Sequence, residues 1–196
     1  MANKKTNIKT LYINSLNHIK NCKKFILTII ILFFFGFLVG LIISPPQEII
    51  VKIIEMLKEI LGQIEGKNTF EIIQFILFNN AKVSIIGLIT GIFLGIIPII
   101  LALTNGYLLG FVALISMQSE GISSLWKILP HGIFELPAIF ISLGLGLELG
   151  TLIFQKDTAK KLKEKLKKSL ITFVLIVVPL LVIAAIIEGI LIGFYI

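Results

Sequence analysis

The sequence predicts an all-α fold, a polytopic transmembrane helix bundle with about five spans and two amphipathic surface helices. Of its 196 residues, 57% are hydrophobic and only 15% are charged, with a mean hydropathy of +1.03. Soluble domains rarely reach such values. Several apolar runs are also long enough to cross roughly 30 Å of hydrocarbon. The charged residues lie mostly in separate polar segments between these runs. We therefore expect one membrane domain with little extramembrane mass.

The first span is expected at residues 25–43, which form an uncharged apolar run. Residues 1–24 precede it as a lysine-rich polar segment. The run ends in "SPPQE" rather than in the small-residue cleavage site of a signal peptide. We therefore expect residues 25–43 to be a retained membrane anchor.

An amphipathic helix is expected at residues 45–65, with Ser44 as its N-cap and proline in its first turn. Its apolar residues recur at helical spacing, and they are Ile49, Ile50, Ile53, Ile54, Leu57, Ile60, Leu61 and Ile64. Lysine, glutamate and glutamine fill the other side, so the helix is too charged to span. It either lies on the membrane surface or packs on a partner.

Two further spans are expected at residues 83–103 and 106–118. Thr104, Asn105 and Gly106 have the composition of a tight turn between them. The second of these segments is short, with about 13 residues against the roughly 20 that a span needs. It is therefore tilted, broken or re-entrant if the turn is placed correctly.

The last two spans are expected at residues 128–154 and 170–195. Pro130 and Pro137 in the first of them, and Pro179 in the second, are candidate helix breaks that expose backbone groups. Residues 156–169 between the two spans form a lysine-rich amphipathic helix suited to the anionic lipid of the inner leaflet.

Charge predicts the orientation of the chain in the membrane. The net charge is +7, and the segments 1–24 and 155–169 hold 13 of the 18 lysines. Residues 44–71 contain more glutamates than lysines. By the positive-inside rule, the N-terminus is cytoplasmic and the C-terminus lies outside. The chain has no arginine, which argues against a nucleic-acid partner.

Ionisable residues within the apolar spans are the candidate functional residues. Counting about 1.5 Å per helical residue places His131, Glu135 and Glu188 in the outer third of the membrane, and Asn79 and Asn80 are expected just before the second crossing on the same side. These five polar residues form one candidate cluster. His131 and Glu135 are four residues apart and therefore share a helix face. Such a pair can relay a proton, bind a metal or form a structural ion pair, and these alternatives remain open.

A second polar pair, Asn105 and Glu148, is expected near the inner face. No zinc-type set of cysteines and histidines is apparent around Cys22, the only cysteine. Motifs of nucleophilic or metal-dependent catalysis are missing. We therefore expect no catalytic residues, no metal and no cofactor.

Glycines and other small residues recur every four positions in several spans. The stripes are Gly36–Gly40, Gly87–Gly91–Gly95, Gly106–Gly110 and Ser142–Gly146–Gly150. Small residues at this spacing let membrane helices approach closely. They pack spans of one bundle together or form a face for a homo-oligomer.

The run "LPHGIFELPAIFISLGLGLELG" (129–150) resembles the signature of the stage II sporulation protein M family of membrane proteins. "FNN" (78–80), "TNGYLLG" (104–110) and "IIEGIL" (186–191) agree with this resemblance, which covers about residues 20–196. The family-motif positions found here are Asn79, Asn80, Asn105, Gly106, Pro130, His131, Gly132, Glu135, Pro137 and Glu188. The resemblance implies a multi-span membrane protein without known catalytic activity. Its namesake anchors a cell-wall-degrading complex during engulfment, and some relatives have been viewed as transporters.

Two functions follow from these observations. The first is a non-enzymatic, self-associating scaffold in the cell membrane that anchors membrane or envelope proteins. The second is a small permease or channel that uses Glu135, Glu188 and His131 to bind an ion, a proton or a polar solute.

Overall fold

The computed structural model describes residues 7–155 and 157–195, and it is all-helical there apart from short connections. The side chains of residues 57, 120, 124–131, 194 and 195 lie outside the description. The α-helices are α1 (Ile8–Asn21), α2 (Lys23–Ile42), α3 (Gln47–Ile64), α4 (Thr69–Thr90), α5 (Ile96–Glu120), α6 (Leu125–Thr151), α7 (Thr158–Thr172) and α8 (Val178–Tyr195). Five helical stretches are long and apolar enough to cross a membrane: α2, α4, α5, α6 and the continuous α7–α8. The predicted all-α membrane bundle is therefore confirmed.

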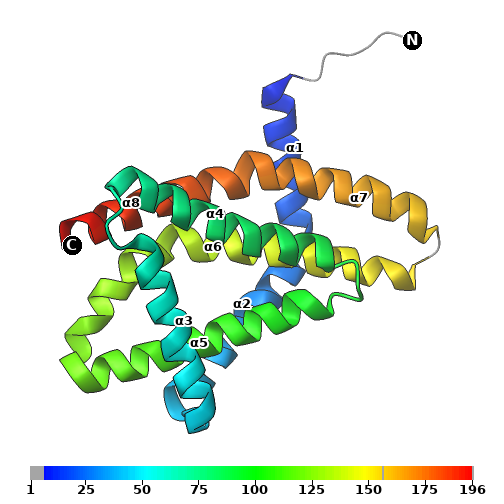
Figure 1. The fold of residues 1–196 in the computed structure, drawn as a ribbon. Helices are drawn as coiled ribbons and strands as arrows, with labels where there is room; N and C mark the ends of the chain where they lie inside the picture. Colours follow the sequence, from blue (N-terminus) through cyan, green and yellow to red (C-terminus); the bar gives the residue numbers. More distant parts are fainter. Residues whose placement is uncertain (1–6, 156, 196) are drawn as a thin grey trace.

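The bundle has two ends, which we name by their composition (Figure 1). The "lysine-rich end" is where α1 joins α2 and where the connections 91–95 and 152–157 lie. The "opposite end" carries the α3–α4 connection and residues 121–124. The α2–α3 connection lies beside the middle of α5, where the Tyr107 hydroxyl donates to the Ile43 carbonyl at 3.1 Å. By the positive-inside rule, the lysine-rich end is the predicted cytoplasmic end.

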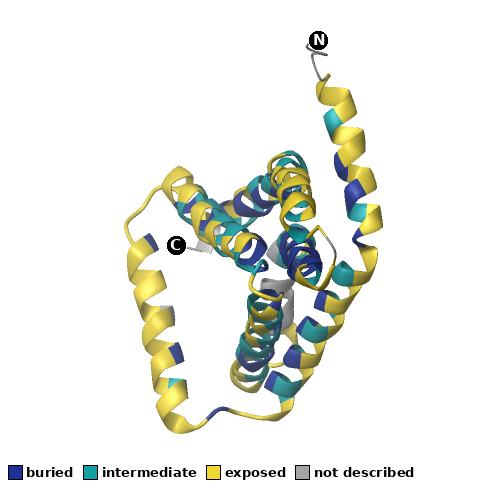
Figure 2. Cartoon of the chain, turned by 90° about the vertical axis from the view of Figure 1, so that its right-hand side faces the viewer, coloured by how far each residue is buried: buried dark blue, intermediate teal, exposed yellow. Residues whose placement is uncertain are grey.

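Two helices lie outside the bundle of spans. At the lysine-rich end, the polar N-terminal segment forms α1, which begins where the Asn7 side chain accepts a hydrogen bond from the Lys9 amide at 3.1 Å. Figure 1 shows α1 projecting away from the other helices. The expected amphipathic helix at 45–65 is observed as α3, but it begins at Gln47 with Pro46 at the N-cap position, so the predicted Ser44 cap is wrong. Figure 2 shows α3 standing to one side of the bundle, with most of its residues exposed.

The prediction of a turn at 104–106 is wrong, because these residues lie inside the continuous helix α5. The chain reverses instead at Gly91–Gly95, between α4 and α5. Gly95 has a φ of 71°, a conformation that glycine adopts without strain. Pro98 then falls in the first turn of α5, where a missing amide hydrogen costs nothing. The spans expected at 83–103 and 106–118 are thus α4 and α5, and neither is short.

The polar side chains of "TNG" form hydrogen bonds within α5, so these residues are accommodated in the helix and do not form a turn. The Thr104 hydroxyl donates to the Ile100 carbonyl at 2.8 Å, and the Asn105 amide donates to the Leu101 carbonyl at 2.7 Å. Bonds of this type to the preceding helical turn are a common way for polar side chains to be accommodated in a helix. Composition alone does not distinguish this arrangement from a turn.

The glycine stripes are used inside the bundle. Gly36 and Gly40 of α2 face the backbone of Leu103 and Tyr107, while Gly106 and Gly110 of α5 face that of Phe33 and Phe37. Residue numbers rise together on the two helices, so α2 and α5 run parallel. A Cβ atom at any of these four glycines would collide with a carbonyl oxygen of the facing helix. Close approach of the two backbones therefore depends on glycine.

The helices α4 and α6 are joined in the same way. Gly91 and Gly146 face each other's helix backbones, and Gly150 faces the backbone of Gly91 and Gly95. The Ser142 hydroxyl also donates across this contact to the Ser84 carbonyl at 2.8 Å. These contacts make α6 the central helix, with 72% of its spanning window buried.

The prolines bend helices rather than ending them. Helical structure continues through Pro130 and Pro137, and Figure 1 shows the first part of α6 running at an angle to the remainder. Proline removes one helical hydrogen bond, which is a known cause of such bends. Before Pro179, a π-helical segment at Phe173–Val177 joins α7 to α8. The lysine-rich helix expected at 156–169 is therefore continuous with the last span.

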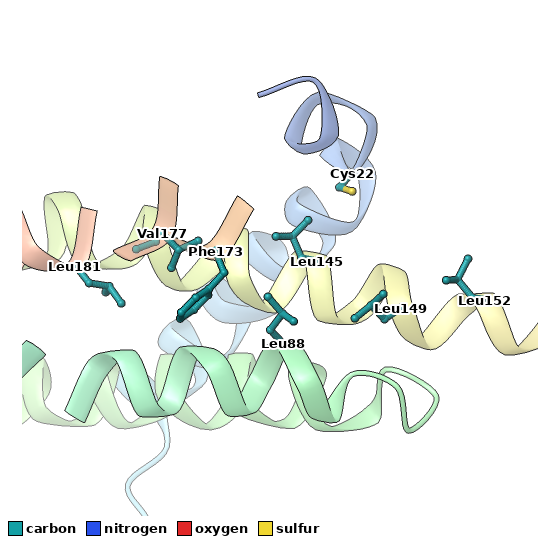
Figure 3. Packing of buried hydrophobic residues seen from close by; sticks show 9 residues of the cluster. Cys22, Leu88, Leu145, Leu149, Leu152, Phe173, Val177 and Leu181 are labelled. Atoms are coloured by element: carbon teal, nitrogen blue, oxygen red, sulfur yellow. The ribbon is translucent and has the colours of Figure 1, made fainter. Parts of the chain in front are cut away.

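An apolar cluster connects these helices near the lysine-rich end. Figure 3 shows Leu88 of α4, Leu145 and Leu149 of α6, and Phe173 and Val177 of the π-segment among its members. Cys22, at the junction of α1 and α2, also belongs to it and is fully buried. This cluster brings the α1–α2 junction against α6 and α7.

Candidate functional site

A buried polar cluster lies at the lysine-rich end of the bundle, and we call it the "inner cluster". It consists of His18 from α1, Cys22 from the α1–α2 junction, Glu148 from α6, and Lys165 and Ser169 from α7. His18 and Glu148 are each 5% exposed, and Cys22 and Ser169 are 0% exposed. Burial of this many polar groups is costly unless they are paired, so the contacts within the cluster decide what it can do.

Local helix geometry presents His18 and Cys22 together. The Cys22 amide donates to the His18 carbonyl at 3.0 Å, which closes the last turn of α1. Residues four apart on a helix share a face, so both side chains point the same way. The Cys22 Sγ lies 3.7 Å from His18 Nδ1.

The other ring nitrogen of His18 faces α6 and α7. Nε2 lies 3.1 Å from the Ser169 hydroxyl and 3.6 Å from Glu148 Oε2. Lys165 pairs with the second carboxylate oxygen of Glu148, Oε1. Glu148 Oε2 itself has no hydrogen-bond partner among the described residues, although its side chain is only 7% exposed. An unsatisfied, buried carboxylate oxygen of this kind is exceptional in native proteins.

Burial favours the neutral forms of His18 and Cys22. Burial lowers the pKa of His18, and this effect outweighs the opposing attraction of Glu148. The contact of His18 with Glu148 is therefore that of a neutral ring with a carboxylate. Burial also raises the pKa of the Cys22 thiol, and the negative charge of Glu148 adds to this increase. Without a further ligand, Cys22 is a protonated thiol.

Cys22 contacts His18, and His18 contacts Glu148, which is the arrangement of a cysteine-hydrolase triad. The environment of Cys22, however, does not fit that function. A catalytic cysteine needs access to substrate and a lowered thiol pKa. Cys22 is 0% exposed, and its pKa is raised. The inner cluster is better suited to structure or to the binding of a small ligand.

Two cavities border the inner cluster. One, of about 290 Å³, is lined by Glu148, Thr151, Lys161, Glu164 and Lys165. The other, of about 370 Å³, is lined by Asn14, Asn17, His18, Asn21 and Lys165. Lys165 and Lys168 border both cavities. Water or a small ion can therefore reach Glu148 through the first cavity and His18 through the second.

Sequence reasoning found only part of this site. It marked Glu148 and Asn105 as polar residues near the inner face, but Asn105 lies nine residues into α5 and bonds to its own helix. It also found no set of metal ligands, whereas the structure brings His18, Cys22 and Glu148 together. The available signal was the spacing of four between His18 and Cys22, just before the first span.

The structure brings two residues of the predicted outer cluster together. Glu135 of α6 interacts electrostatically with Glu188 of α8, and both are half-buried. The side chain of His131 lies outside the described residues. Asn79 and Asn80 lie in the middle of α4 rather than before the span, and Asn79 is exposed.

A polar face on α4 also escaped the sequence analysis, and we call it the "α4 polar face". Its exposed polar residues are Glu71, Gln74, Asn79 and Lys82. They border an open cavity of about 450 Å³ that also includes Phe75 and Phe78. Lys82 lies eight residues from the end of α4, which is about 12 Å along the helix. An exposed lysine at that depth in a span is expensive unless protein or water covers it.

Comparison with known proteins identifies the family. The chain is 37% identical over 123 residues to an uncharacterised protein of Methanocaldococcus jannaschii, an alignment that covers 58% of this chain and 66% of the relative. The chain thus spans slightly less than two thirds of that relative's length. No solved structure matches. The family model described as Stage II sporulation protein M matches residues 29–191. The protein therefore belongs to the stage II sporulation protein M family.

Proposed function

We propose that this protein is a non-enzymatic, self-associating anchor in the cell membrane that holds partner proteins through helices outside its bundle. The observation that carries the proposal is α3, an amphipathic helix whose apolar side its own chain covers only in part. Ile53 and Ile64 are buried, whereas Ile49, Ile54 and Leu61 are 42–60% exposed. Figure 2 agrees with this distribution, since α3 stands clear of the spans along most of its length.

The charge of α3 favours a protein partner over the lipid surface. Helices that bind membrane surfaces are typically rich in lysine and arginine on their polar side. Within Gln47–Ile64 there are three glutamates and two lysines. An acidic helix with an apolar stripe is instead typical of segments that dock into a groove of another protein.

The helix α1 offers a second docking surface at the other end of the bundle. Ile8, Tyr12 and Leu16 follow one another at intervals of four residues and are 40–74% exposed. With the predicted orientation, α1 lies in the cytoplasm and α3 outside. Such an arrangement lets one small membrane protein hold partners on both sides.

Self-association is proposed because the α4 polar face needs a cover within the hydrocarbon. The glycine stripes are already occupied by contacts inside the bundle, so they do not serve this purpose. A second copy of the chain is present wherever the protein is inserted, and its contact with the α4 polar face would shield these polar residues from lipid. Cross-linking tests this interface. Asn79→Cys, in a Cys22→Ser background, is then expected to form disulfide-linked dimers in native membranes. Phe35→Cys, at an exposed position of α2, provides the control. Equal cross-linking of the two cysteine variants would count against a specific interface.

The anchor function is tested by purifying the tagged full chain from native membranes after cross-linking. Leu61→Glu places a charge on the apolar side of α3, and Gln63→Glu places the same charge on the exposed polar side. We expect partner proteins to be recovered with the wild type and with Gln63→Glu, and to be lost with Leu61→Glu. Equal recovery with both variants, or no partner with the wild type, would contradict the proposal.

A small permease is the second candidate, and the interaction of Glu135 with Glu188 favours it. Two neighbouring carboxylates within a span are the usual means of binding a proton or a cation. The test is flux in liposomes, in which Glu135→Gln and Glu188→Gln each abolish transport while the exposed α7 variant Glu164→Gln leaves it unchanged. If purified wild-type protein moves neither protons nor alkali cations, the permease function is excluded for these ions.

A further inference from the structure

We propose that His18, Cys22 and Glu148 form a binding site for a divalent metal ion of the zinc class at the lysine-rich end of the bundle. One donor atom from each residue lies within 4.8 Å of the other two, and all three residues are buried. They come from three places in the fold, namely α1, the α1–α2 junction and α6. Packing of the first two helices against α6 is therefore what assembles the site.

The donor chemistry selects the class of ion. A thiolate, an imidazole and a carboxylate are ligands that Zn²⁺ combines in proteins, whereas Mg²⁺ and Ca²⁺ require oxygen ligands. With metal–ligand bonds of about 2.0–2.3 Å, neighbouring ligands of a tetrahedral site lie roughly 3.5 Å apart. His18 Nδ1 lies 3.7 Å from Cys22 Sγ, and His18 Nε2 lies 3.6 Å from Glu148 Oε2. Only one ring nitrogen binds a given ion, so one of these two separations meets the tetrahedral value directly, and the three donor atoms lie within 4.8 Å of one another. Three protein ligands leave a fourth position for water.

The surrounding contacts are those that orient metal ligands. A coordinating histidine usually donates its other ring N–H to a nearby acceptor, and coordinating carboxylates are themselves hydrogen-bonded. If Nδ1 binds the ion, Nε2–H donates to the Ser169 hydroxyl at 3.1 Å. Lys165 already holds the Oε1 atom of Glu148, whereas Oε2 makes no hydrogen bond among the described residues and has His18 Nε2 at 3.6 Å. A metal ion would satisfy this buried, unpaired oxygen.

The lysines around the site do not prevent cation binding. Lys165 and Lys168 both border the two cavities beside the cluster. A Cys22 thiolate and the Glu148 carboxylate together carry two negative charges, which balance the two positive charges of the ion. Lys165 can then keep its contact with Glu148, and a metal of this class deprotonates a coordinating thiol. The cavities also provide the route by which an ion enters.

A metal ion in this position would hold α1 to the bundle. Ser15, His18 and Cys22 are the buried residues by which α1 and its junction pack against the other helices. Coordination by Glu148 would tie this contact to α6, and Ser169 would extend it to α7. The site would thus fix the direction in which α1 projects.

The test uses the untagged full chain, purified in detergent and titrated with Co²⁺ and then with Zn²⁺. Because the chain has a single cysteine, a thiolate-to-Co²⁺ charge-transfer band in the wild type reports coordination by Cys22 without any substitution. We expect one equivalent of Co²⁺ to produce the band and one equivalent of Zn²⁺ to remove it. Zn²⁺ is also expected to raise the melting temperature of the wild type, and a chelator to lower it.

Variants identify the other ligands. Glu148→Gln and His18→Ala are expected to abolish the band or to weaken Zn²⁺ binding by at least about a hundredfold, and Ser169→Ala to weaken it by about tenfold. Glu164→Gln alters an exposed acid that borders the same cavity and is expected to bind as the wild type does. Absence of the band in the wild type would overturn the proposal. So would undiminished Zn²⁺ binding in Glu148→Gln.

Discussion

At the scale of single residues, four glycines set the distance between α2 and α5. Gly36, Gly40, Gly106 and Gly110 each face a carbonyl or amide of the neighbouring helix. Their spacing was visible in the sequence, but the sequence left open whether they pack within the bundle or between copies. The structure assigns them to the bundle because Phe33, Phe37, Leu103 and Tyr107 of the same chain fill the facing positions.

Gly106→Ala tests this contact. The added Cβ atom would collide with the Phe33 carbonyl, which is backbone and cannot move without shifting a helix. We expect a loss of about 1–3 kcal/mol in the free energy of unfolding, as for other overpacked sites. Gly62→Ala on α3 is the matched control, since nothing lies within 4 Å of its added atom. Unfolding of both variants in mixed detergent micelles measures the difference, and equal stability would contradict the close contact.

The ion pair of Glu148 with Lys165 leads to a second prediction. Lys165 is 32% exposed at its side chain, whereas Glu148 is only 7% exposed. In the metal-free protein, Lys165→Met leaves a buried carboxylate without its cation, and such losses are strongly destabilising. We expect a cost of about 1–3 kcal/mol, reduced from that of a fully buried pair because Lys165 is partly solvated.

The exposed Lys167 lies two residues away and provides the control for that prediction. Lys167→Met removes the same charge from α7 without unpairing Glu148. Chelator-treated protein is compared by thermal unfolding, and Lys165→Met is expected to melt at a lower temperature than Lys167→Met. A similar melting temperature for the two variants would mean that the ion pair contributes little.

The depth of a residue in a span can be counted from the sequence. The direction in which its side chain points and the residues that it contacts cannot be deduced in this way. Glu148 was therefore recognised as a polar residue near one face, whereas its partners could not be identified. His18 and Lys165 are separated from it by 130 and 17 positions, and only the packing of α1 and α7 on α6 brings them together. Asn105 carried the same polar signal, yet it bonds to Leu101 of its own helix.

At the scale of elements, helix type was predictable, but the start of α4 and the turn between α4 and α5 were not. Apolar composition identified α2, α6 and α8 within a few residues, apart from the bend and the π-segment. The α4–α5 turn was misplaced because "GIFLG" is as apolar as the spans around it. Gly91, Gly95 and Pro98 were the local signal, since glycine and a following proline mark a reversal and a helix start.

Labelling of introduced cysteines distinguishes the two placements of this turn. In a Cys22→Ser background, Phe93→Cys lies in the turn and Thr104→Cys lies within α5. A membrane-impermeant maleimide should label position 93 in inside-out vesicles and not in intact cells. Position 104 should stay unlabelled in both preparations, because it is within the hydrocarbon. Labelling of position 104 instead of position 93 would restore the turn at 104–106.

At the scale of the whole molecule, the distribution of charge relates the fold to its membrane. The α7 lysines continue directly into the last span, because α7, the π-segment and α8 form one continuous helical stretch, of which Thr158–Gly193 contains 36 residues. That length is about 54 Å, well beyond the roughly 30 Å of hydrocarbon. We therefore expect the basic part of the helix to extend into the lipid headgroup region at the lysine-rich end. If the predicted orientation is correct, the α7 lysines contact anionic lipid headgroups, and the stability of the protein should depend on the charge of the lipid.

The exposed lysines Lys160, Lys163 and Lys167 of α7 are expected to stabilise the protein in anionic lipid. Each lysine near such a surface contributes about 1 kcal/mol at moderate ionic strength. Wild-type protein in nanodiscs should therefore melt at a higher temperature with phosphatidylglycerol than with phosphatidylcholine, and added salt should reduce the difference because it screens the headgroup charge. Replacing all three lysines by glutamine should abolish the difference. Replacing Lys52 and Lys58 of α3 should preserve it, since α3 is predicted to lie at the other surface. A lipid dependence that survives the α7 substitutions would place the interaction elsewhere on the molecule.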